Sequence, residues 1–118
     1  MSDSDPNCLF CRIAAGEIPA TLVHRDDDVV AFRDINPQAP THVLVIPVQH
    51  VASAHELTPA HDQSWARVLH VAQQIAEAEG LDRDGYRLVV NIGRNGGQTV
   101  DHLHVHLLGG RQMTWPPG

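Results

Sequence analysis

The sequence is poor in several residue types, and each shortage excludes a class of protein. Only 8 of its 118 residues are Lys or Arg, against 14 Asp and Glu, so the formal net charge is −6. This balance, with no cluster of basic residues among aromatic ones, argues against a nucleic-acid-binding surface. It also argues against a clamp of basic side chains around a phosphate group. Backbone N–H groups and imidazoles can still build a phosphate site in such a chain.

Long apolar runs are absent as well. No run approaches the roughly 20 apolar residues that a membrane span needs, so we expect no membrane association. Residues 1–7 are polar and acidic, with neither the positive start nor the apolar stretch of a secretory signal. We therefore expect a cytoplasmic protein. There the two cysteines, Cys8 and Cys11, would stay reduced, which leaves them metal-binding, redox-active or incidental.

The chain length fits one domain whose core needs no disulfide. We expect a flexible tail over residues 1–7 and a single domain over 8–118, including the C-terminal segment. Apolar spacing predicts a short helix over 8–15 and a long helix that begins at Thr58-Pro59 and ends at Gly80. Apolar runs predict five strands, at 21–24, 29–33, 42–48, 86–92 and 101–107. This order predicts an α+β fold with a five-stranded antiparallel sheet.

What the sequence does have is histidine, with nine residues in 118. In the segment 102–107, three histidines alternate with three apolar residues. Because alternate side chains of a strand point to opposite faces, the pattern predicts an apolar face toward the core and three histidines on the other face. Such a row can act along an extended substrate or bind a metal. The simpler alternative is an exposed polar strand face.

The histidines and the loop before them suit phosphoryl chemistry. A neutral imidazole can attack electrophilic phosphorus when its other ring N–H is anchored, and a second imidazole can protonate the departing group. The loop Gly96-Gly97-Gln98-Thr99 lies just before the histidines. Alone it indicates a flexible hairpin loop, but beside imidazoles its N–H groups, amide and hydroxyl suit a phosphoryl group.

The segment HLHVHLL resembles the histidine triad motif, His-φ-His-φ-His-φ-φ, of the HIT superfamily. The resemblance covers nearly all of the chain beyond residues 1–7. It is closest to the HINT branch, the purine nucleoside phosphoramidases, through the segments "EIPA", "DINPQAPTHVLVIP", "RLVVNIG", "GGQTVDHLHVHLLGGRQM" and "WPPG". It implies a HIT-like fold assembled as a homodimer. It also implies hydrolysis of the P–N bond of adenosine 5′-phosphoramidates, with AMP released through a nucleotidyl-histidine intermediate.

The resemblance assigns roles residue by residue. It implies that His104 is the nucleophile, that His106 contacts the phosphate and helps the leaving group, and that His102 supports the site. Thr99 stands where the family commonly has Ser, which keeps the hydroxyl, whereas Asp101 stands where an aromatic residue is often found. The implied nucleotide contacts are Asn91, Gly97, Gln98 and Thr99 for the phosphate, Asp34 and Ile35 for the ribose, and Phe10, Ile13, Ile18 and Phe32 for the base. For these last four residues a plain core role is an equal alternative.

The resemblance also gives the cysteines a purpose. Bacterial-type HIT relatives and galactose-1-phosphate uridylyltransferases are similar in joining such a Cys pair to two histidines, which here are His50 and His102. With Cys8 and Cys11 they imply a closed, structural zinc site that braces the N-terminal helix and is not required for catalysis. For Trp115 the resemblance implies contact with the partner chain near its active site. The alternative is a tail residue that covers an apolar surface.

Three alternatives to the phosphoramidase stay open. One is a dinucleoside polyphosphate hydrolase, against which the "WPPG" and "GGRQM" segments speak. Another is a nucleotide-binding regulatory module with little catalysis, although the intact histidines and Thr99 count against lost chemistry. The last is a catalytic metal held by the three triad histidines, which would leave the cysteines without a purpose.

Overall fold

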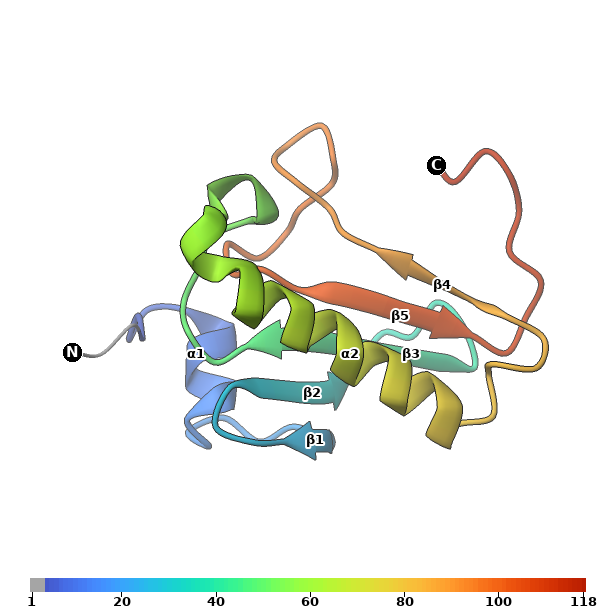
Figure 1. The fold of residues 1–118 in the computed structure, drawn as a ribbon, viewed down its shortest axis with the longest axis horizontal. Helices are drawn as coiled ribbons and strands as arrows, with labels where there is room; N and C mark the ends of the chain where they lie inside the picture. The colour runs from blue at the N-terminus through green and yellow to red at the C-terminus, as the bar shows by residue number, and fades with distance from the viewer. Residues whose placement is uncertain (1–3) are drawn as a thin grey trace.

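A computed structural model describes residues 4–118, which form one five-stranded antiparallel sheet with a helix on each face (Figure 1). The strands lie in the order β1-β2-β3-β5-β4. The elements are α1 (Leu9–Ala14), β1 (Leu22–Arg25), β2 (Val29–Arg33), β3 (Thr41–Pro47), the 3₁₀ turns η1 (Ala54–Glu56) and η2 (Pro59–His61), α2 (Asp62–Ala78), β4 (Tyr86–Val89) and β5 (Val105–Gly109). The predicted α+β class and the five-stranded sheet are confirmed. Within residues 4–118, no helix is both long and apolar enough to cross a membrane.

Side chains of β2 and β3 alternate between two hydrophobic clusters. One cluster lies under α2, and the other lies between the sheet and α1. Both strands are therefore covered on both faces, which explains why their sequences are nearly continuous apolar runs. The α2 face takes Val29, Ala31, Val43 and Val45, and the α1 face takes Val30, Phe32, Leu44 and Ile46.

The long helix begins three residues later than predicted. A 3₁₀ turn over Pro59–His61 precedes α2, and Thr58 donates its backbone N–H to Nδ1 of His61 at 3.0 Å. This local bond favours the tighter turn before the α-helix starts at Asp62. The other end is as predicted. Gly80 has φ +75°, and the next residue, Leu81, donates its N–H back to the carbonyl of Ala76 at 2.8 Å, which closes the helix.

The last two strands are shorter than predicted, so fewer of the triad histidines lie in a strand. β4 ends at Val89 rather than Ile92, and β5 starts only at Val105. The predicted strand over all three histidines is therefore wrong for the first two. The physical reason is a competing bond, since Leu103 donates its N–H to the carbonyl of Val51 at 2.7 Å. That bond holds Leu103 against the segment between β3 and α2, so its N–H does not take part in the sheet.

The predicted N-terminal tail lies partly outside the described residues. Within its described part, Asp5 donates its backbone N–H to Sγ of Cys11 at 3.3 Å, and its carbonyl accepts the N–H of Cys8 at 3.0 Å. These bonds attach residue 5 to the start of α1.

Candidate active site

β5 and the segment before it bring the three triad histidines to the α1 face of the sheet. The rings of His104 and His106 have centroids 5.0 Å apart. His102 is fully buried and His104 is 5% exposed, so neither lies on an exposed polar strand face. Phe10 of α1 packs edge-on against His104, with ring centroids 5.2 Å apart. The α1 helix therefore covers the site on the side of Phe10.

The hydrogen bonds of His104 define its reactive atom. Its Nδ1 lies 2.7 Å from the carbonyl oxygen of His102, and a carbonyl only accepts, so Nδ1 carries the proton. In the neutral ring, Nε2 then keeps its lone pair. A buried, anchored imidazole with a free Nε2 is the arrangement that nucleophilic attack on phosphorus requires.

A fourth histidine, which sequence reasoning missed, joins the site from β3. His42 is 5% exposed, and its Nδ1 accepts the backbone N–H of Gln38 at 3.0 Å. The proton of the neutral ring is therefore on Nε2, which lies 2.9 Å from Nδ1 of His106. His42 thus donates to His106, and His106 presents its own Nε2–H as a donor. One sequence signal could have found it, because His42 shares its strand parity with Leu44 and Ile46 of the α1 face.

Burial keeps the imidazoles of His42 and His106 neutral. It lowers the pKa of His106 to about 4, an effect that nearby His104 and His42 reinforce and the carboxylate of Asp34 opposes. Burial also lowers the pKa of His42, again against Asp34. Both rings are therefore uncharged at neutral pH. The pair is a chain of neutral donors and acceptors, whose protons are placed by the Gln38 amide.

Asp34, His42 and His106 have donor atoms within 4.8 Å of one another, a spacing that a metal ion could bridge. The hydrogen bonds oppose this use. A metal at Nε2 of His42 would push the ring proton to Nδ1, where the N–H of Gln38 already donates. The cluster is better suited to moving a proton. Within the described residues the three triad histidines form no such cluster with one another, so the catalytic-metal alternative loses its support.

A second cluster has the properties of a zinc site. Cys8, Cys11, His50 and His102 place their donor atoms within 4.8 Å of one another. Sγ of Cys8 and Nδ1 of His50 each lie 3.3 Å from Nδ1 of His102, and Sγ of Cys11 lies 3.5 Å from it. Ligand atoms around tetrahedral zinc are separated by roughly 3.3 to 3.8 Å, given the usual Zn–N and Zn–S lengths. The four residues therefore fit the metal.

The second bond of His102 prepares it as a ligand. Its Nε2 lies 2.8 Å from the carbonyl of Pro47, so this nitrogen carries the proton and Nδ1 turns its lone pair toward the thiols. Burial, with smaller effects of His50 and His104, lowers the pKa of His102 to about 4, against the bond to Pro47. Burial raises the pKa of the Cys8 thiol, although the backbone N–H of Cys11, which donates to Sγ of Cys8 at 3.4 Å, acts in the opposite direction. His102 thus serves both sites, because its carbonyl also holds His104.

The predicted phosphate loop is a closed turn over residues 93–98. Gln98 uses its side chain to hold it, accepting the N–H of Gly93 at 3.0 Å and donating to the carbonyl of Ala52 at 2.7 Å. Asn91 donates to the carbonyl of Gly96 at 2.7 Å. The side chains of Gln98 and Asn91 therefore shape the loop. Gly97 has φ +79°, a conformation that favours glycine, and Thr99 is exposed at the end of the loop.

The predicted ribose and base residues fall into two groups. Asp34 reaches the site, with Oδ2 3.5 Å from Nε2 of His42, whereas the side chain of Ile35 is fully exposed. Three predicted base residues are buried in the cluster under α1, and the fourth is partly buried against it. They are Phe10, Ile13 and Phe32, and then Ile18. The buried three therefore pack in this cluster, and Phe10 also touches His104.

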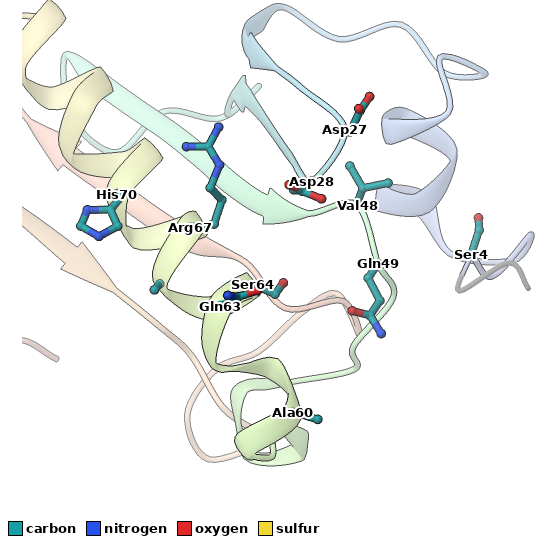
Figure 2. Close-up of a pocket in the computed structure, with 11 residues that line it drawn as sticks. Ser4, Asp27, Asp28, Val48, Gln49, Ala60, Gln63, Ser64, Arg67 and His70 are labelled. Carbon is teal, nitrogen blue, oxygen red and sulfur yellow. The ribbon is translucent and has the colours of Figure 1, made fainter.

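Trp115 is 82% exposed and lies in the C-terminal segment, where Arg87 of β4 donates to the carbonyl of Thr114 at 2.9 Å. A cavity of about 820 Å³ is lined by none of the predicted site residues. Figure 2 shows that it lies between α2, with Arg67 and His70, and the β1–β2 turn, with Asp27 and Asp28. It is separate from the triad histidines.

Comparison with known proteins agrees with this geometry. Residues 15–113 match the model of the HIT domain family. A purine nucleoside phosphoramidase of Escherichia coli (strain K12) is 50% identical over 105 residues, which cover 89% of this chain and 88% of that protein. A 14 kDa zinc-binding protein of Zea mays is 51% identical over 119 residues, covering 97% of this chain and 90% of that protein. The crystal structure of a HIT family hydrolase from Legionella pneumophila Philadelphia 1 superimposes with a TM-score of 0.94 at 57% identity, covering 95% of this chain and 100% of that chain.

Proposed function

The chain belongs to the HIT family of nucleotide hydrolases. We propose that it cleaves the P–N bond of purine nucleoside 5′-phosphoramidates and releases the purine nucleoside monophosphate, which is AMP for an adenosine substrate. The observation that carries this proposal is the complementary protonation of two neighbouring rings. His104 has a free Nε2 because its Nδ1–H is held by the carbonyl of His102. His106 has a free Nε2–H because its Nδ1 accepts from His42. One ring can attack phosphorus while the other protonates the amine that leaves.

In the first step, Nε2 of His104 forms a bond to phosphorus as the P–N bond breaks. The departing nitrogen takes the proton from Nε2 of His106 and leaves as a neutral amine, so His106 becomes an imidazolate beside the positively charged imidazolium of the nucleotidyl-His104 until the second step returns its proton. The product on the protein is a nucleotidyl-histidine. In the second step, water attacks phosphorus, its proton returns to Nε2 of His106, and the P–N bond to His104 breaks. Nucleoside monophosphate is released and both rings regain their starting protons.

The remaining site residues take supporting roles in this proposal. Thr99 and the N–H groups around Gly97 would contact the phosphate, in a loop shaped by Gln98 and Asn91. Asp34 would hold the ribose together with Ile35. Phe10 would place the base against the hydrophobic cluster between the sheet and α1. The large exposed side chain of Ile35 agrees with a surface that a ligand covers.

We propose that Cys8, Cys11, His50 and His102 hold structural zinc, which supplies a fixed cross-link between α1 and the segment that carries the triad. The name of the Zea mays relative and the donor geometry support this assignment. The Pro47 carbonyl fixes the tautomer of His102 that such a ligand needs.

We further propose a cytoplasmic homodimer whose single domain spans residues 8–118. β4 is an edge strand of the sheet, and its Leu88 is 38% exposed, while Ile92 beyond it is 45% exposed. An apolar, unpaired edge strand is suited to pairing with a second copy. Figure 1 shows the C-terminal segment on the same side as β4. A dimer through this edge would bring the exposed Trp115 toward the partner chain.

A steady-state comparison tests the proposed reaction. The full chain is assayed with an adenosine 5′-phosphoramidate, a guanosine 5′-phosphoramidate and a dinucleoside polyphosphate, and AMP binding is measured in parallel. We expect the phosphoramidates to give much the higher kcat/KM. A preference for the dinucleoside polyphosphate would favour that hydrolase instead. Tight AMP binding without turnover of any substrate would indicate a regulatory module.

A further inference from the structure

A second cavity, of about 430 Å³, opens directly onto the metal cluster. Two of the four ligands, Cys8 and His50, contribute to its wall. The rest of the wall comes from the start of α1 and the segment before it, and from the segments after β3 and after the phosphate loop. These residues are Asp5, Asn7, Leu9, Ala52, Thr99, Val100 and Asp101.

The four ligands differ in their access to this space. Cys8 is 8% exposed and His50 is half-buried, and both line the cavity. Cys11 is 2% exposed and His102 is fully buried, and neither belongs to the wall. The cavity therefore approaches the cluster from one side, with Cys8 and His50 in front and the other two ligands behind them.

The wall of the cavity has one sign of charge. It contains the carboxylates of Asp5 and Asp101 and no Lys or Arg. Asp101 is exposed, while Asp5 already accepts the N–H of Asn7 at 2.9 Å. A concave surface lined by carboxylates raises the local concentration of cations and speeds their arrival. A divalent cation would thus be drawn toward the two accessible ligands.

We propose that this cavity is the passage through which zinc reaches and leaves the cluster of Cys8, Cys11, His50 and His102, with Asp101 attracting the incoming ion. The inference rests on the zinc centre proposed above and is independent of the hydrolase reaction. A closed structural site exchanges its metal only when the surrounding fold opens. With this passage, the ion exchanges while α1 and the sheet stay in place.

The first test narrows the passage. Ala52→Phe puts a large side chain in the wall of the cavity, and Ala60→Phe, at a wall position of the other cavity, is the matched control. Zinc uptake by the reduced, metal-free full chain and zinc release to a chromophoric chelator are followed by stopped flow. We expect uptake and release of Ala52→Phe to slow together by about tenfold, with unchanged zinc affinity, because a passage affects rates and not the equilibrium.

The second test concerns the charge at Asp101. Asp101→Asn should slow zinc uptake by about threefold at low ionic strength, and the difference should vanish at high salt. The control is Asp84→Asn, which removes an exposed carboxylate that lines neither cavity. Asp101→Asn keeps the proposal open to refutation if Ala52→Phe does not fold.

Specific outcomes would overturn the proposal. Unchanged exchange rates in Ala52→Phe would exclude the passage, as would a change confined to zinc affinity. Wild-type uptake rates in Asp101→Asn would exclude the role of the carboxylate. A wild-type chain that binds no zinc would remove the whole inference. Phosphoramidate hydrolysis is measured on separate samples of the same preparations, so its failure would be seen independently of zinc exchange.

Discussion

The bond from His42 to His106 makes a specific prediction about leaving groups. His42→Ala removes the donor that occupies Nδ1 of His106, so the proton of the neutral His106 ring is no longer confined to Nε2. A ring with its proton on Nδ1 cannot protonate the departing amine. The substitution should therefore impair proton donation while leaving Nε2 of His104 free to attack.

The size of the effect follows from what the bond supplies. General acid catalysis by a positioned side chain contributes about 100- to 10,000-fold, and loss of one hydrogen bond that orients the acid removes part of this. We expect kcat for a phosphoramidate of a basic amine to fall by about 10- to 100-fold. For a substrate whose leaving group needs little protonation, the fall should shrink to less than about threefold.

The assay is a series of adenosine phosphoramidates whose leaving amines differ in basicity, measured with wild type, His42→Ala and His42→Gln. The Gln side chain offers an N–H donor and should recover part of the rate. His70→Ala, on the exposed surface of α2, is the control for loss of an imidazole. An equal fall for all leaving groups would refute the proton-positioning role, and so would an unchanged kcat for the most basic amine.

Four further predictions follow from the same geometry. His104→Ala should abolish phosphoramidate turnover yet keep measurable AMP binding in calorimetry, and retained turnover would exclude it as the nucleophile. Thr99→Ala should lower kcat/KM by about tenfold in steady-state assays while Thr99→Ser stays near wild type, and an unaffected Thr99→Ala variant would remove the hydroxyl from the reaction. Chelation of zinc should lower the Tm, followed by circular dichroism, far more than the activity of the folded protein, whereas complete and reversible loss of activity with an intact fold would favour a catalytic metal. Burial raises the pKa of Asp26, but bonds from His24 and from backbone amides, with Arg67, outweigh it and lower the pKa to about 2. Because this folded-state pKa lies below the unfolded value, the bonds should contribute about 2 kcal/mol above pH 4 that is lost as the pH falls toward 2, and urea unfolding of Asp26→Asn should show a weaker decline over that window.

The sequence pattern predicted most of the fold because its elements are locally specified. Strands β2 and β3 are apolar on both faces, and Gly80 ends α2 at the predicted place. The errors lie where a hydrogen bond that the apolar pattern does not show, distant in one case and local in the other, competes with the predicted element. β5 starts late because the N–H of Leu103 bonds to Val51, which is far away in the chain. The helix α2 starts later than predicted because the side chain of His61 accepts the N–H of Thr58, a bond that apolar spacing does not show.

The candidate site divides in the same way. The alternating histidines and the Cys8/Cys11 pair are visible as spacing, whereas His50 and His102 as partners of the two cysteines were implied only by the family resemblance. His42 was not predicted, because its strand parity with Leu44 and Ile46 indicates the face on which it lies but not that His106 is its partner. Only the antiparallel register that places Leu44 opposite His106 brings His42 within reach.

By itself, then, the sequence determined which chemical groups are available and which face of each element is apolar, because both depend on residue type and on spacing within one element. The tertiary structure alone decided where the protons lie. Gln38, Pro47 and the carbonyl of His102 each bond one ring nitrogen of a different histidine. Whether an imidazole attacks, donates or binds metal depends on which nitrogen is already used, and that is set by backbone groups that folding brings to it.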